Sequence, residues 1–177
     1  MRIKIRAVQG LVILVFFCLQ STVFQSLSIG SIVPNLLLIV TVSFGFMRGK
    51  LSGLWTGLFC GLLKDVFYGN LLGFYALIYL CIGYVAGCCC KIFYDEEIRV
   101  PLFLVAAGDI LYGILVYGMQ FLMRGRLQIF YYFGRIMIPE MIYTVLVTVI
   151  LYKLLFKLNR KLSELEMKER DSIWLRK

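Results

Sequence analysis

Residues 57–77 read GLFCGLLKDVFYGNLLGFYAL, and this stretch decides the fold. It contains the end of one apolar run, a short turn at Gly69-Asn70 and the start of a second apolar run. The two runs extend over about residues 51–66 and 71–92. A helix crosses about 30 Å of hydrocarbon with roughly 20 mostly apolar residues, so the stretch predicts a hairpin of two transmembrane helices.

The composition of the whole chain indicates a membrane protein. Of its 177 residues, 61% are hydrophobic and 16% are charged. A soluble domain has about half apolar and about a quarter charged residues. Six spanning helices would use about 120 residues, which leaves no room for a separate soluble domain. The composition therefore excludes soluble enzymes, nucleic-acid-binding modules and secreted disulfide scaffolds.

Apolar runs along the chain predict an all-α fold, a single bundle of six transmembrane helices formed by residues 1–156. Pro34 and Pro101 each begin a run, which suits proline because the first N–H groups of a helix have no intrahelical partner. Aromatic residues crowd the segment 127–135, as in an interfacial belt. The predicted helices cover about residues 7–27, 34–47, 51–66, 71–92, 100–123 and 135–156.

The polar tail, residues 157–177, shows an amphipathic helical pattern. Leu158, Leu162 and Leu165 are spaced by four and three residues, which places them on one helix face. One interpretation is a solvated extension of the last transmembrane helix. The other is a helix that lies on the membrane surface or docks a cytoplasmic partner. The sequence leaves both open.

The placement of lysine and arginine predicts the orientation, because cytoplasmic loops are enriched in both. With six crossings and a cytoplasmic N-terminus, both termini are cytoplasmic and four basic residues lie outside: Lys64, Arg124, Arg126 and Arg135. The other basic residues lie inside: Arg2, Lys4, Arg6, Arg48, Lys50, Lys91, Arg99, Lys153, Lys157, Arg160, Lys161, Lys168, Arg170, Arg176 and Lys177. The net charge of +9 therefore reflects topology, and no nucleic-acid partner is expected.

The chain lacks the residues of many catalytic and metal sites. It has no histidine, which excludes His-based triads, His-ligated haem and the usual zinc sites. Its six cysteines show no C-x-x-C spacing, and the run Cys88-Cys89-Cys90 indicates either a plain helix end or an S-acylation site. Gly108-Asp109 is similar to the motif of intramembrane aspartyl proteases, but no second aspartate fits. We expect no enzyme, cofactor or metal.

The predicted helix 51–66 carries a stripe of small residues on one face. Gly53, Gly57, Gly61 and Asp65 are four residues apart, and small residues at this spacing let another helix approach closely. The stripe serves internal packing or a partner helix. Asp65 needs water, a backbone amide or a cation, and an arginine of an outer loop is the better candidate because Lys64 points to another face.

Two further carboxylates lie within the predicted spans. Asp109 is about ten residues into its helix, roughly 15 Å deep, and Tyr112 continues its face. Glu140 shares a face with Tyr143. Ionisable groups at this depth are costly and are functional candidates by default. The alternative is that tyrosine hydroxyls and backbone carbonyls simply satisfy them, and the sequence leaves both readings open.

Several of these stretches together resemble the rod shape-determining protein MreD family of bacterial inner membranes. Residues 57–77 are similar to its G-L-L-x-D … G … L-G signature, residues 34–38 to its P-N-L-L-L motif, and Gln20-Ser21-Thr22 is also similar. The resemblance covers about residues 1–160 and carries nothing over for Asp109 or Glu140. Its ordered positions are Gln20, Pro34, Asn35, Gly61 to Asp65, Gly69 and Gly73.

The resemblance implies a non-enzymatic scaffold of the cell-elongation machinery. Such proteins bind MreC, a single-span protein with a large extracytoplasmic domain. The assembly connects MreB filaments to the peptidoglycan synthases RodA and a class B penicillin-binding protein. The family fold is thought to be similar to that of the substrate-binding subunits of energy-coupling-factor transporters.

That fold similarity supplies an alternative function, a membrane subunit that binds a vitamin-type small molecule for a transporter. Such a subunit needs an outward pocket with convergent polar groups and aromatic walls. Asp65, Glu140, Arg135 and the aromatic run 130–133 are the candidates for such a pocket. Co-purification separates the two functions, because a vitamin binder brings down a ligand and ATPases whereas an MreD brings down MreC.

Overall fold

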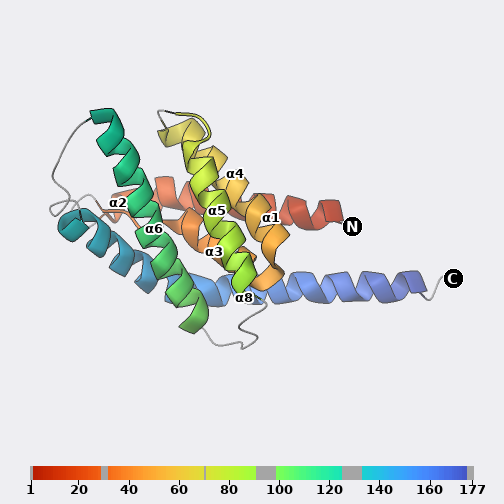
Figure 1. The fold of residues 1–177 in the computed structure, drawn as a ribbon. Coiled ribbons are helices and arrows are strands. Elements are labelled where there is room, and N and C mark those ends of the chain that lie inside the picture. Colours follow the sequence, from red (N-terminus) through yellow and green to blue (C-terminus); the bar gives the residue numbers. More distant parts are fainter. Residues whose placement is uncertain (1, 29–31, 70, 91–98, 125–132, 175–177) are drawn as a thin grey trace.

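The chain folds into a bundle of helices (Figure 1). The computed structural model describes residues 2–28, 32–69, 71–90, 99–124 and 133–174, and every regular element within them is helical. The all-α prediction is confirmed, and each predicted helix has a counterpart. The elements are α1 (Arg2–Ser21), α2 (Val23–Ser26), α3 (Leu36–Arg48), α4 (Lys50–Tyr68), α5 (Phe74–Cys89), α6 (Arg99–Arg124), the π-helical turn η1 (Phe133–Met137) and α8 (Ile138–Trp174).

Three segments of the described chain are long and apolar enough to cross a membrane. They are Arg6–Ser26, Arg99–Met119 and Phe133–Glu164. Two further apolar helices, α3 and α5, are shorter. The transmembrane character is therefore confirmed by length and composition, while the count of six spans remains a prediction.

Helix α3 forms the centre of the bundle. All its residues from Leu36 to Phe46 are buried, and it packs against α1, α4, α5, α6 and α8. A helix that is apolar on every side is found in a protein core or across a membrane, and here other helices cover every side of it. At 1.5 Å per residue its 13 residues span about 20 Å, less than the hydrocarbon thickness.

Helices α4 and α5 form the closest-packed pair, and the glycine stripe of α4 is their contact. A Cβ atom added at Gly53 would approach the carbonyl oxygen of Gly83 to well under 3.0 Å, and one at Gly57 would meet the carbonyl oxygen of Tyr79 in the same way. A Cβ at Gly61 would collide with the backbone of Ala76. The sequence left open whether this glycine face serves internal packing or a partner helix. In the structure it is occupied by α5.

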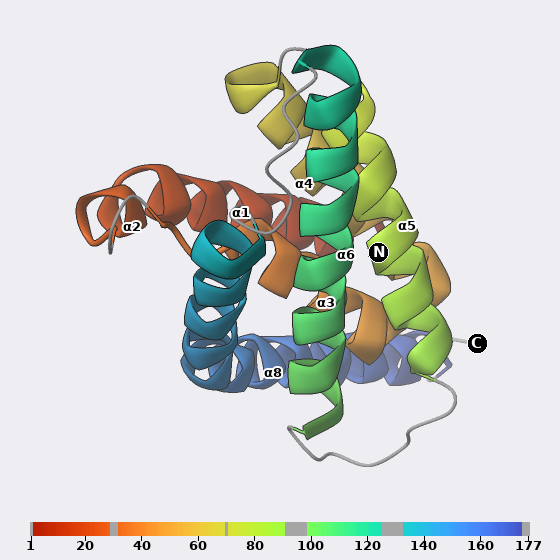
Figure 2. The ribbon, with the colours of Figure 1, turned by 60° about the vertical axis from the view of Figure 1, so that its left-hand side comes forward.

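The tail continues the last helix. Helix α8 runs unbroken to Trp174, although it changes direction part-way along (Figure 2). Arg48 Nε, at the end of α3, donates a hydrogen bond to Asn159 Oδ1, and Leu162 is buried. The tail is therefore helical and joined to the last helix, and its relation to the membrane surface or to a partner remains a prediction.

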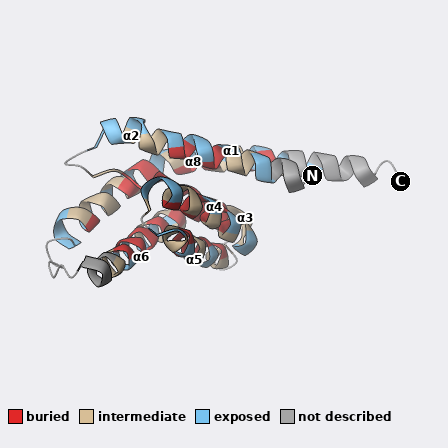
Figure 3. Ribbon diagram, turned by 90° about the horizontal axis from the view of Figure 1, so that it is seen from above, coloured by how far each residue is buried: buried red, intermediate tan, exposed pale blue. Residues whose placement is uncertain are grey.

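The periphery of the bundle is formed by the N-terminal segment. Helix α2 has no buried residue and lies at one edge of the molecule (Figure 3). The beginning of α1 and the end of α8 lie at the same end of the molecule (Figures 1 and 2). Cys88, Cys89 and Cys90 are half-buried free thiols at the end of α5.

We predict that Gly57→Leu destabilises the protein by about 1–3 kcal/mol or more, because the new side chain would collide with the α5 backbone. Gly118→Leu is the matched control, since a Cβ added at Gly118 meets no atom within 4 Å. Thermal unfolding in detergent, monitored by size-exclusion chromatography, measures the stability of both variants. Equal unfolding temperatures for the two variants would contradict the packing role of Gly57.

Candidate functional site

Asp65, at the end of α4, closes the α4–α5 hairpin. Its side chain is 3% exposed. Its Oδ2 accepts hydrogen bonds from the backbone N–H groups of Gly73 and Ala76, both at 3.0 Å, and its Oδ1 accepts one from Tyr75 at 2.9 Å. These donors belong to the cap and first turn of α5, which have no intrahelical acceptor. A carboxylate there also interacts favourably with the helix dipole.

The turn between the helices is built around this carboxylate. A Cβ atom at Gly69 would lie 2.6 Å from the carbonyl oxygen of Asp65, and Gly73 has φ of 99°, a conformation that favours glycine. The three amides fill the role that the sequence had led us to expect for an arginine of an outer loop. The turn beside Asp65 therefore requires glycine at both positions, because a side chain would collide at Gly69 and would be strained at Gly73.

Lys64 points to a different face of α4 from Asp65 and is half-buried among tyrosines of α5 and α6. Its Nζ lies 4.4 Å from the ring centroid of Tyr112, 5.5 Å from that of Tyr75 and 5.6 Å from that of Tyr79. It also donates a hydrogen bond to the Tyr79 hydroxyl at 3.4 Å. An ammonium group over aromatic faces is attracted by the ring quadrupoles, most strongly when water is excluded. Lys64 is therefore an interior cation, not a loop charge.

Asn35 connects this cation to the rest of the bundle. It is 1% exposed, and its Oδ1 accepts hydrogen bonds from the Tyr79 hydroxyl at 2.6 Å and from the Leu38 N–H at 3.4 Å, which caps α3. Its own backbone N–H donates to Thr144 Oγ1 of α8 at 3.2 Å. A chain of hydrogen bonds thus runs from Lys64 through Tyr79 to Asn35, and the Asn35 backbone extends it to Thr144.

Two carboxylates complete the cluster around Lys64. Glu140 of α8 and Asp109 of α6 lie near enough to Lys64 for their charges to act on one another across the cluster. Asp109 is 4% exposed and lies beside Asn35 and Thr144. Opposite charges offset part of the cost of removing ions from water. We call this set the Lys64 cluster; its members are Asn35, Lys64, Tyr75, Tyr79, Asp109, Tyr112, Glu140 and Thr144.

The cluster retains unused hydrogen-bonding capacity. Among the described residues, Asp109 Oδ1 has no hydrogen-bond donor and Asn35 Nδ2 has no acceptor. The two side chains are neighbours. Unpaired buried polar atoms are rare in folded proteins, so this pair stands out within the cluster.

Some of the residues that the sequence predicted as functional candidates lie in this cluster, and others lie elsewhere. Asp109, Glu140, Tyr112 and Asn35 come together, whereas Tyr143 donates a hydrogen bond to the Leu27 carbonyl at 3.4 Å, outside the cluster. The sequence analysis missed Lys64 as the centre, together with Tyr75, Tyr79 and Thr144. The spacing of the two tyrosines, four residues apart in the predicted helix 71–92, was the available signal.

The geometry limits the chemistry of the site. Within the described residues there is no group of three or more His, Cys, Asp or Glu side chains that could hold a metal ion. Asp65 is engaged by three amides, so it is not free to act as a second catalytic carboxylate or to bind a vitamin-type ligand. The aromatic residues 130–132 proposed for such a pocket lie outside the described residues.

Comparison with known families decides the identity of the chain. The family model of the rod shape-determining protein MreD matches residues 1–162. The chain belongs to the MreD family. No curated protein and no solved structure matches it. The family match runs from α1 into α8, so it includes both the hairpin and the Lys64 cluster.

MreD membership confirms the resemblance predicted from the sequence. It assigns this membrane protein a role in the determination of rod shape. The MreD family is a family of shape-determining membrane proteins and not a known family of enzymes.

We predict that Asp65→Asn lowers stability by about 1–3 kcal/mol, because one oxygen becomes an N–H donor that faces other donors. Glu164→Gln is the control, since it makes the same chemical change at an exposed side chain. Denaturant titration in detergent measures both. A loss for Asp65→Asn no larger than that for Glu164→Gln would show that the amide bonds do not hold the hairpin.

The electrostatic contact of Lys64 with Glu140 predicts a measurable coupling. In a double-mutant cycle of Lys64→Met and Glu140→Gln, we expect a coupling energy of about 0.5–3 kcal/mol. The control cycle uses Arg160→Met and Glu164→Gln, whose side chains are 75% and 57% exposed and lie 3.4 Å apart. There we expect about 0–1 kcal/mol. Additive losses at Lys64 and Glu140 would show that their charges do not interact.

Proposed function

We propose that this chain is the multi-pass inner-membrane scaffold of the rod elongation complex. It binds an MreC-like single-span protein and helps to couple MreB filaments to peptidoglycan synthesis by RodA and a class B penicillin-binding protein. The observation that carries the proposal is the MreD family match over residues 1–162, which spans nearly the whole bundle. The apolar composition of its helices supports membrane recognition through helix contacts and not through a soluble domain.

The proposal includes six spans in residues 1–156, with the tail 157–177 and both termini in the cytoplasm. The bias of basic residues supports it. The beginning of α1 and the end of α8 also lie at the same end of the molecule (Figures 1 and 2). Because Lys64 lies within the bundle, it no longer counts among the outer loop charges, and the bias becomes stronger.

In this proposal the hairpin presents a surface to the partner. The glycine stripe is covered by α5, so a partner has to contact exposed residues instead. The tip of the hairpin carries several large apolar side chains, of which Leu72 is 77% exposed and Phe67 is 63% exposed. Asp65 fixes the turn that presents them. In the proposed topology this tip lies at the outer membrane surface, beside the extracytoplasmic domain of an MreC-like protein.

We predict that Leu72→Ser lowers capture of the co-expressed MreC-like protein of the same organism several-fold. Leu51→Ser is the matched control, because Leu51 is 75% exposed at the opposite end of the same hairpin. Affinity purification in mild detergent measures capture, and rod shape in cells gives a second readout. If the unmodified chain captures no MreC-like protein, the proposed function is wrong. If both variants capture equally, only the hairpin surface is wrong.

A further inference from the structure

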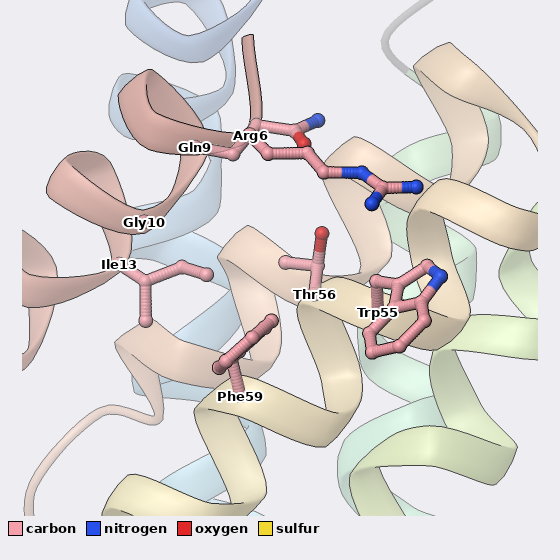
Figure 4. A pocket seen from close by; sticks show the side chains of 7 residues that line it. All are labelled: Arg6, Gln9, Gly10, Ile13, Trp55, Thr56 and Phe59. Carbon is pink, nitrogen blue, oxygen red and sulfur yellow. The ribbon is translucent and has the colours of Figure 1, made fainter. Parts of the chain in front are cut away.

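A groove lies between the first halves of α1 and α4 (Figure 4). Its cavity volume is about 190 Å³, roughly that of six water molecules. Arg6, Gln9, Gly10 and Ile13 line it from α1, and Trp55, Thr56 and Phe59 line it from α4. The groove is distinct from the Lys64 cluster, since it shares no residue with it.

The two ends of the groove differ in chemistry. Figure 4 shows the Arg6 guanidinium, the Gln9 amide and the Thr56 hydroxyl gathered at one end, with Ile13 and Phe59 at the other. The guanidinium lies over the Trp55 ring, 5.7 Å from its centroid. One end is therefore cationic and rich in hydrogen-bond donors, and the other is apolar.

The position of the groove suits a lipid, whose headgroup lies at the membrane surface and whose acyl chains lie in the hydrocarbon. Arg6 begins the first candidate span, and Ile13 is about 10 Å further along α1. The cationic end thus lies at the membrane surface and the apolar end within the hydrocarbon. Arg2 and Lys4 precede Arg6 in the sequence and Lys50 begins α4, so the surface end also lies in a basic segment of the chain.

We propose that this groove binds an anionic phospholipid of the cytoplasmic leaflet. The phosphate group lies at Arg6, beside the Gln9 amide, whose Nε2 also donates a hydrogen bond to Ser52 Oγ at 3.1 Å. One acyl chain runs past Gly10 between Ile13 and Phe59. The charge of Arg6 complements a phosphate, and the apolar lining suits a hydrocarbon chain better than water. Trp55 is 46% exposed, so the groove opens toward the lipid that would fill it.

Gly10 leaves the space that the acyl chain occupies. A Cβ atom added there meets no atom within 4 Å, so a larger side chain fits without displacing the backbone and fills the groove. This separates the two contributions to binding, because Arg6 is predicted to select the headgroup and Gly10 to admit the chain.

The test is native mass spectrometry of the full chain in detergent, titrated with phosphatidylglycerol or with phosphatidylcholine of the same acyl chains. We expect the unmodified chain to bind the anionic lipid about five-fold more tightly, the effect of one basic group near an anionic lipid. Arg6→Gln removes this preference and Arg6→Lys keeps most of it. Gly10→Leu weakens the binding of both lipids.

The controls are Lys157→Gln, which removes an exposed charge elsewhere, and Gly118→Leu, which adds the same side chain at another open glycine. Both are expected to bind as the unmodified chain does. An unchanged preference in Arg6→Gln, or unchanged binding in Gly10→Leu, would overturn the proposal. So would loss of MreC-like capture in Gly10→Leu with lipid binding intact, since the occupant would then be a partner helix.

Discussion

The carboxylate of Asp65 holds three backbone N–H groups at the start of α5, and the arrangement of the hairpin depends on these bonds. They fix the end of α4 against the beginning of α5 and so set the register of the two helices. That register places the glycines of α4 opposite the carbonyl groups of α5. A charge-assisted bond in a low-dielectric environment is strong, and three on one side chain leave little freedom for the turn.

The orientation of Lys64 follows from the same constraint. Adjacent side chains on a helix point to different faces, so when Asp65 turns toward α5 its neighbour turns toward α6 and α8. An ammonium group enters the interior only where partners replace its hydration. Tyr75 and Tyr79 supply aromatic faces from the helix that Asp65 caps, and Glu140 supplies a negative charge. The hairpin and the cluster around Lys64 are thus two results of one local geometry.

The sequence predicted much of this arrangement and missed its polar connections. Apolar runs and turn residues were sufficient to place the helices, and the spacing of Gly53, Gly57 and Gly61 was sufficient to identify a close-packing face. A backbone amide was one of the partners that the sequence left open for Asp65. Which amides bind it was not predictable, because nearly every residue has one and only the folded turn aligns three of them. The placement of basic residues along the chain predicted Lys64 as a charge of the outer side. That rule considers only sequence position, so it could not predict the contacts of Lys64 with the tyrosines.

Contacts between distant parts of the chain were the least predictable, and they determine how α3 is held. Asn35, before α3, donates its N–H to Thr144, and Arg48, at its end, donates to Asn159, so both ends bond to α8. One helix thus satisfies both polar ends of a buried helix that is too short to cross the hydrocarbon by itself. Asn159 belongs to the polar tail, so the beginning of the tail helps to hold α3 in the bundle.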